Sequence, residues 1–88
     1  MRLDKFLKVS RIIKRRIIAN QACDSGKIIV NNKIAKAGLN LKIGDIIQIK
    51  FKNKTLKIKV LNLNEFVRAG EVLSMYEIIA EETNKNDS

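Results

Sequence analysis

The chain has 88 residues, with 18 Lys and Arg against 9 Asp and Glu, and its formal net charge is +9. This length allows one small domain, and a hydrophobic fraction of 45% is too high for a disordered chain. The single Cys excludes an internal disulfide, and the absence of His argues strongly against a zinc site. No apolar run approaches the ~20 residues of a membrane span, and the N-terminus lacks a secretory apolar segment, so we expect a cytoplasmic protein.

The first predicted element is an amphipathic helix near the N-terminus. Leu3, Phe6 and Leu7 recur at the spacing that places side chains on one helical face. The basic residues Arg2, Lys5 and Lys8 follow one another at three-residue steps on another face.

A second helix is predicted to follow directly and to end near Ser25. Gly26 suits the residue after a helix because it adopts the left-handed conformation without a Cβ clash. The predicted apolar stripe of this helix is Ile13, Ile17, Ile18, Ala22 and Cys23. The cations predicted to crowd its N-terminal turn are Arg11, Lys14, Arg15 and Arg16. We expect Cys23 to be a small buried hydrophobe rather than a reactive thiol.

Short strands are predicted for the rest of the chain. Residues 28–30 and 33–35 should form a hairpin around Asn31-Asn32, since Asn tolerates positive φ. A loop over 36–41 and a turn over 43–45 follow. Alternating apolar residues then predict strands over 46–51 and 56–60, joined by a turn at 53–54.

The C-terminal third has a weaker pattern. Residues 64–75 show no clear period and predict an irregular segment with one helical turn, whereas 76–81 alternate as in a last strand. From Glu82 onward the chain is polar and is expected to fray. We therefore predict one domain over 1–82, with a core motif at about 2–51, C-terminal strands at about 55–80 and a polar tail at 83–88.

Charge is distributed unevenly along the chain. Residues 1–60 hold 16 Lys and Arg against 3 Asp and Glu, a net +13, whereas residues 61–88 hold 2 against 6, a net −4. Cations at a helix N-terminus oppose the helix dipole, so this clustering favours anion binding over a merely solvated basic face. A basic folded body of this kind predicts salt-dependent binding of polyphosphate.

A catalytic or metal-binding role is not expected. The chain offers no His, no metal cluster and no Gly-rich phosphate loop, and nothing completes a reacting constellation. Asp4, alone among the N-terminal cations, is predicted to orient a nearby guanidinium, for instance that of Arg16. The four aromatic residues are too sparse for a base-stacking platform, and the lysines of the predicted strands are better explained as protection of sheet edges.

Several motifs occur in a recognisable order: RLDKFL at 2–7, KRR at 14–16, GKI at 26–28 followed by Val30-Asn31, and GD at 44–45. They resemble the alpha-L, or S-four-type, RNA-binding domain. The short stand-alone form is similar to the ribosome-associated heat-shock-fifteen family, and most of all to its RqcP-type quality-control branch. Three positions depart from the usual motif: Arg15 replaces a Ser, Asn32 a Gly and Cys23 an Ile or Leu.

The resemblance implies an α+β fold, with two N-terminal helices packed on a small, bent, mostly antiparallel sheet and RNA bound on the helical face. The implied partners are large-subunit rRNA, peptidyl-tRNA on obstructed large ribosomal subunits and the bacterial alanine-tailing factor. We expect a monomer without a cofactor. The residues expected to contact RNA phosphates are Arg2, Lys5, Lys8, Arg11, Lys14, Arg15 and Arg16.

Two other functions remain open at this level. The same module could bind free large subunits during assembly or after heat shock, without a role in alanine tailing. A third reading is a basic DNA-compacting protein, which predicts comparable affinity for duplex DNA and rRNA. The compact two-helix motif, without dimer heptads or a long basic arm, argues against that reading.

Overall fold

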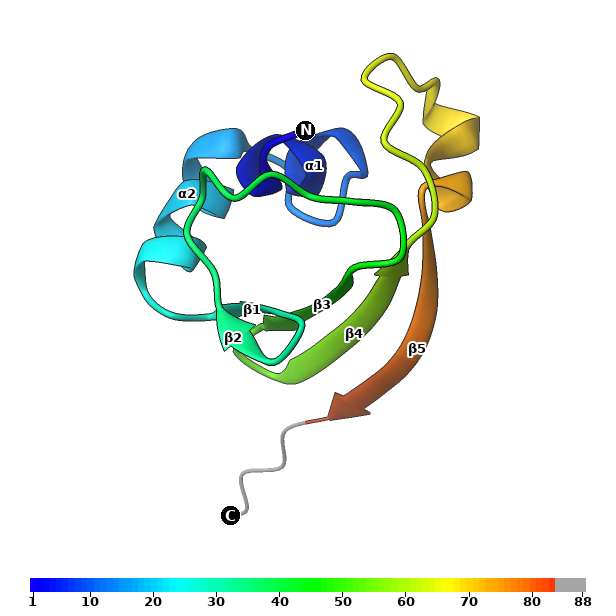
Figure 1. Cartoon of the computed structure of the whole chain (residues 1–88). Coiled ribbons are helices and arrows are strands. Elements are labelled where there is room, and N and C mark those ends of the chain that lie inside the picture. Colours follow the sequence, from blue (N-terminus) through cyan, green and yellow to red (C-terminus); the bar gives the residue numbers. More distant parts are fainter. Residues whose placement is uncertain (84–88) are drawn as a thin grey trace.

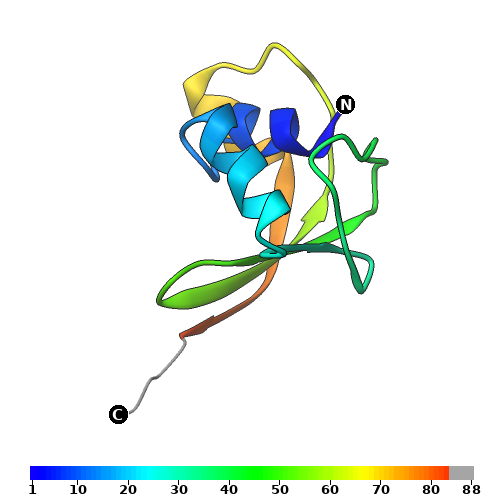
Figure 2. The same ribbon diagram turned by 90° about the vertical axis from the view of Figure 1, so that its left-hand side faces the viewer.

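Two short helices lie on one side of a curved five-stranded sheet (Figures 1 and 2). The computed structural model describes residues 1–83. In chain order the elements are α1 (Leu3–Val9), α2 (Arg16–Asp24), β1 (Ile28–Val30), β2 (Lys33–Ile34), β3 (Ile46–Lys50), β4 (Lys54–Val60), the 3₁₀ helix η1 (Ala69–Ser74) and β5 (Tyr76–Thr83). The sheet order is β2-β1-β3-β4-β5, and every neighbouring pair is antiparallel. The predicted α+β architecture is confirmed.

The core lies between α1 and the central strands. Leu3, Phe6 and Leu7 of α1 are completely buried, which confirms the predicted apolar face of the first helix. The alternation predicted for the central strands also holds, and the inward residues with no or almost no exposed area are Ile28, Ile47, Ile49, Ile58 and Val60. Burying each large aliphatic or aromatic side chain contributes about 1.5–3 kcal/mol, so this layer is the main source of stability.

The second helix differs from its prediction at its beginning. It starts at Arg16, because the backbone of Arg15 is extended, with φ −125° and ψ 138°. Arg11 has a left-handed φ of 62° in the irregular connection that follows α1. Arg11, Ile13 and Lys14 therefore lie in the connection between the helices. Ile13 is buried there, so its spacing to Ile17 does not report a helical stripe.

Besides Ile13, two more members of the apolar stripe predicted for α2 were wrong. Ile17 and Ile18 are 70% and 48% exposed, whereas Ala19 and Cys23 are buried. The side of α2 that packs against α1 and the core therefore carries the small residues Ala19 and Cys23.

Two turns predicted from glycine and asparagine are confirmed. Gly26 has a φ of 74°, its amide donates to the carbonyl of Cys23, and the Lys27 amide donates to that of Ala22. These two bonds form a Schellman motif at the end of α2. Asn31 and Asn32 have φ values of 51° and 71°, as a two-residue type I′ hairpin turn requires.

The last strand extends farther than predicted. β5 pairs with β4 from Tyr76 to Thr83, so Glu82 and Thr83 belong to the sheet and not to a frayed tail; residues 84–88 lie outside the described residues. A register shift opposite Lys57 and Ile58 interrupts the alternation. Both Ile78 and Ala80 are exposed, because β5 is an edge strand and its far end extends away from the helices (Figure 2).

Within residues 1–83, neither helix has the length or the apolar composition to cross a lipid bilayer.

We predict that Gly26→Ala lowers the free energy of unfolding by about 1–2 kcal/mol, because a Cβ is unfavourable in the left-handed conformation. An added Cβ at this position would lie 3.9 Å from Ile34 Cδ1, so the cost comes from the backbone and not from a clash. Urea denaturation measures the effect. Gly70→Ala is the matched control, since an added Cβ there meets open space and Gly70 does not have a positive φ. Equal stabilities of the two variants would contradict this account.

Candidate nucleic-acid interface

A buried carboxylate joins the two helices at the N-terminal end of each. Asp4 is 2% exposed, and its carboxylate accepts hydrogen bonds from Arg2 Nε at 3.2 Å and Asn20 Nδ2 at 3.3 Å. Arg16 approaches both carboxylate oxygens, with Nε 3.3 Å from one and a terminal guanidinium nitrogen 3.4 Å from the other. The predicted contact between Asp4 and Arg16 is therefore present, and Arg2 shares it.

Asp4 remains charged despite its burial. Burial raises the pKa of the Asp4 carboxyl, but the hydrogen bonds from Arg16, Arg2 and Asn20 and the charge of Arg16 lower it by more. The net result is a pKa below the ordinary value of an aspartate. At neutral pH the carboxylate is an anion held between two guanidinium groups.

The backbone around Asp4 is fixed by a loop from far along the chain. The amides of Leu3 and Asp4 donate to the carbonyls of Leu39 and Ala37, at 2.8 and 3.1 Å. The Lys5 amide donates to the Asp4 carboxylate at 2.8 Å. The first amides of a helix have no partner within it, so the loop and the Asp4 side chain together satisfy the start of α1.

The two guanidinium groups remain accessible. The side chains of Arg2 and Arg16 are 51% and 48% exposed, although each contacts a carboxylate that is almost fully covered. A hollow of about 480 Å³ lies at this point, lined by Asp4, Arg16, Ile17, Asn20 and Gln21. We call Arg2, Asp4, Arg16 and Asn20 the Asp4 cluster. It places two oriented guanidinium groups and a side-chain amide at the protein surface.

Other predicted cations gather elsewhere. Lys8, Arg11 and Lys14 line a second hollow of about 500 Å³, together with Val9, Glu65 and Val67. We call this the Lys8 hollow. Within residues 1–83 none of its three cations forms an ion pair. Arg15 is exposed at the N-cap of α2, and its side chain makes no capping hydrogen bond.

Lys5, which is predicted to contact RNA phosphates, forms an ion pair in the structure. Its Nζ pairs with the carboxylate of Glu65, and this pairing lowers the Glu65 pKa. Glu65 lies sixty positions away in a segment without a regular pattern, so no sequence signal indicated the pair. Asn20 was also missed, although its position four residues after Arg16 puts it on the same helical face.

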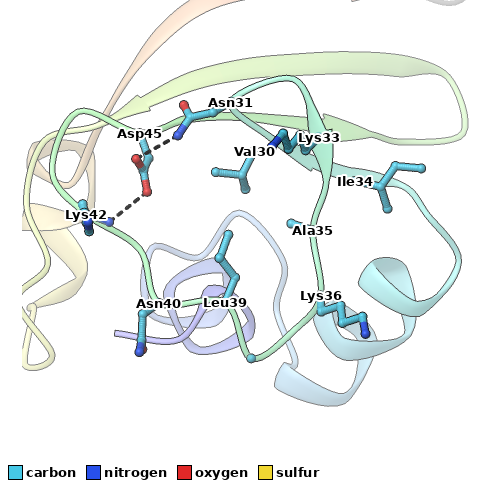
Figure 3. A pocket seen from close by; sticks show the side chains of 11 residues that line it. Val30, Asn31, Lys33, Ile34, Ala35, Lys36, Leu39, Asn40, Lys42 and Asp45 are labelled. Carbon is cyan, nitrogen blue, oxygen red and sulfur yellow. Dashed lines mark hydrogen bonds between the residues drawn. The ribbon is translucent and has the colours of Figure 1, made fainter.

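A third hollow, of about 970 Å³, lies between the β1–β2 hairpin and the loop over 36–42 (Figure 3). Its aliphatic residues include Val30, Ile34 and Leu39, and none of the predicted site residues lines it. At one end Asp45 accepts hydrogen bonds from Asn31 Nδ2 and the Lys42 amide, which ties the hairpin to the loop. The motif residues Asn31 and Asp45 therefore have a structural explanation.

Reactive groups are few. Burial raises the pKa of the Cys23 thiol to about 11, and nearby carboxylates of Asp4 and Asp24 add to this effect. The thiol is 4% exposed, so it fits the predicted role of a small core residue. Across residues 1–83 there is no group of three His, Cys, Asp or Glu side chains placed to hold a metal ion.

Comparison with known proteins gives a consistent result. Residues 1–47 match the family model described as S4 domain. The chain is 49% identical over 81 residues to an RQC P-site tRNA stabilizing factor of Streptococcus pneumoniae, covering 92% of each chain. It is 44% identical over 82 residues to the protein of that name from Bacillus subtilis, covering 93% of this chain and 95% of the relative. The trimeric structure of Vibrio cholerae Heat Shock Protein 15 superposes with a TM-score of 0.83 at 28% identity, over 91% of this chain and 82% of the other.

We predict that Asp4→Asn lowers the free energy of unfolding at pH 7 by about 1–3 kcal/mol, because it removes the charge that two arginines contact. The folded-state pKa of Asp4 is lowered, so its stabilisation is present above the unfolded-state value of about 3.9 and is lost as pH falls through the folded-state pKa. The gap between wild type and variant should therefore shrink below about pH 4. Urea denaturation from pH 2.5 to 7 measures it.

The control is Asp24→Asn, which removes an exposed carboxylate that forms no ion pair within residues 1–83. A gap between wild type and Asp4→Asn that stays constant over the whole pH range would show that the Asp4 charge does not stabilise the fold.

Proposed function

Because the chain belongs to the S4-domain family, among relatives named RQC P-site tRNA stabilizing factor, we propose that it is a non-enzymatic RNA-binding factor of ribosome-associated quality control. The observation that carries this proposal is the Asp4 cluster. A buried carboxylate holds Arg2 and Arg16 in fixed positions while leaving about half of each side chain exposed. Arginines fixed in this way suit phosphate, whose oxygens accept paired N–H donors.

Structured RNA is the ligand class that the surface fits best. Double-stranded RNA is recognised mainly by shape and by contacts to phosphates and 2′-hydroxyl groups. The Asp4 cluster offers guanidinium groups for phosphates, and the adjacent amides of Asn20 and Gln21 offer donors and acceptors for hydroxyl groups. The exposed cations Arg15, Lys8, Arg11 and Lys14 extend this basic surface.

More specifically, the proposed ligands are large-subunit rRNA and peptidyl-tRNA on obstructed large ribosomal subunits. The protein would act there as a monomer beside the bacterial alanine-tailing factor, and would support the addition of alanine tails to stalled nascent chains. The name of these relatives, which refers to the P-site tRNA, supports this choice of ligand.

We predict that Arg16→Ala weakens binding to large-subunit rRNA about tenfold or more, since a hydrogen bond to a charged group contributes about 1.5–3 kcal/mol. Lys59→Ala is the matched control, because it removes one exposed cation from β4, on the sheet, and should cost much less. Arg16→Lys separates charge from geometry, since it keeps the charge but loses the paired donors. Fluorescence anisotropy at fixed salt measures the affinities, and thermal melts confirm folding.

Similar losses from Arg16→Ala and Lys59→Ala would show that binding depends on total charge and not on a site. Equal affinity for duplex DNA and rRNA at matched salt would favour the DNA-compacting alternative.

We predict that deleting the gene reduces C-terminal alanine tails on stalled nascent chains in cells. A plasmid copy of the wild-type protein should restore the tails and an Arg16→Ala copy should not, because the proposed activity depends on RNA binding. Mass spectrometry or immunoblotting of a stalled reporter measures the tails. If deletion leaves the tails unchanged although the wild-type protein binds large subunits, the alternative role in assembly or heat-shock recycling would be supported.

A further inference from the structure

One aromatic side chain stands apart from the core. Phe66 is 92% exposed, whereas Phe6 is fully buried and Phe51 is half-buried. It lies in the segment between β4 and η1, which rises beside the helices in Figure 1. An exposed phenyl ring presents an apolar π face to water, so covering it with another ring is favourable.

The segment that carries Phe66 is anchored on both sides. Immediately before it, Glu65 pairs with Lys5 of α1. Immediately after it, Val67 packs partly buried against the core. At the start of η1 the Arg68 amide then donates to the Glu71 carboxylate at 3.4 Å. Phe66 is therefore held outside the core by neighbours that are themselves fixed.

The two anchoring residues also line the Lys8 hollow, together with Lys8, Arg11 and Lys14. Within residues 1–83 these three cations form no ion pair, and the one carboxylate of the hollow, Glu65, is already paired with Lys5. The hollow therefore carries positive charge that no ion pair neutralises. Phe66 does not itself line the hollow, but it lies in the chain between two residues that do.

We propose that Phe66 and the Lys8 hollow bind a single unpaired RNA nucleotide, with its base stacked on the Phe66 ring and its phosphates at Lys8, Arg11 and Lys14. This inference rests on the RNA-binding function proposed above and names the RNA feature that is recognised. An unpaired base is required because a base inside a duplex has both faces covered by its neighbours. Aromatic side chains bind splayed bases in this way whatever their sequence.

The placement relative to the Asp4 cluster defines the form of the RNA. The cluster lies at the N-terminal ends of both helices, whereas the hollow lies at the end of α1 and the following connection. Lys5 links them, since its amide contacts Asp4 and its Nζ contacts Glu65. One RNA could therefore place a paired stem on the cluster and an adjacent bulged or looped nucleotide on Phe66.

The test uses two RNA hairpins of equal length, one fully paired and one with a single bulged nucleotide, and measures affinity by fluorescence anisotropy. Phe66→Ala should weaken binding of the bulged hairpin about tenfold and leave the paired hairpin unchanged. Phe66→Tyr should retain binding, because the ring remains, whereas Phe66→Leu should not. Leu73→Ala, which removes another large exposed apolar side chain at 70% exposure, is the control and should change neither affinity.

The bulged nucleotide can also carry 2-aminopurine, whose fluorescence should fall when the wild-type protein stacks on it and change less with Phe66→Leu. Equal affinities of wild type and Phe66→Ala for both hairpins would overturn this inference. If Arg16→Ala weakens hairpin binding in the same assay, the proposed RNA-binding function stands even though the inference about Phe66 fails. If Phe66→Ala weakens binding to large subunits but leaves both hairpin affinities unchanged, Phe66 contacts a protein. That result would also overturn the inference.

Discussion

The buried carboxylate of Asp4 is the constraint on which the helical face depends. An ionised carboxylate that is 2% exposed would be strongly unfavourable without partners, and here two guanidinium groups, an amide side chain and a backbone amide supply them. Because these partners come from α1, α2 and the residue before α1, satisfying one charge fixes how the two helices lie together. The same contacts hold Arg2 and Arg16 in place, so the proposed recognition of RNA depends on the group that stabilises the helix pair.

The sheet contributes to the site through the loop that leaves it. Carbonyls of Ala37 and Leu39 accept the first amides of α1, and Asp45 ties that loop to Asn31 of the hairpin. The region that presents the arginines is therefore supported by residues more than thirty positions away. Charge is also distributed unevenly over the fold. The helical side carries clustered cations, whereas the acidic strand β5 forms the sheet edge at the opposite end from β2. Such a separation favours approach of an anionic ligand to the helical face.

Much of the fold could be predicted because its signals are local. The spacing of Leu3, Phe6 and Leu7, the glycine at position 26 and the alternation around Ile47 each reflect the geometry of one element. The second helix was predicted less well, because Ile17 and Ile18 are exposed and Ile13 is buried in a loop. Hydrophobicity alone does not determine whether an isoleucine faces the core, the solvent or a ligand. No sequence signal indicated the left-handed backbone of Arg11.

The sequence by itself determined the family, the helix-then-sheet order, the basic N-terminal half and the pairing of Asp4 with an arginine, since each depends on residue type and short spacing. Only the tertiary structure decided which cations remain free. Lys5 pairs with Glu65, and Arg2 joins Arg16 on one carboxylate. Lys8, Arg11 and Lys14 are left together beside Glu65 and Val67, the chain neighbours of the exposed Phe66. These arrangements depend on contacts between segments far apart in the chain, and the free energy of such contacts depends on burial and distance, which no local pattern encodes.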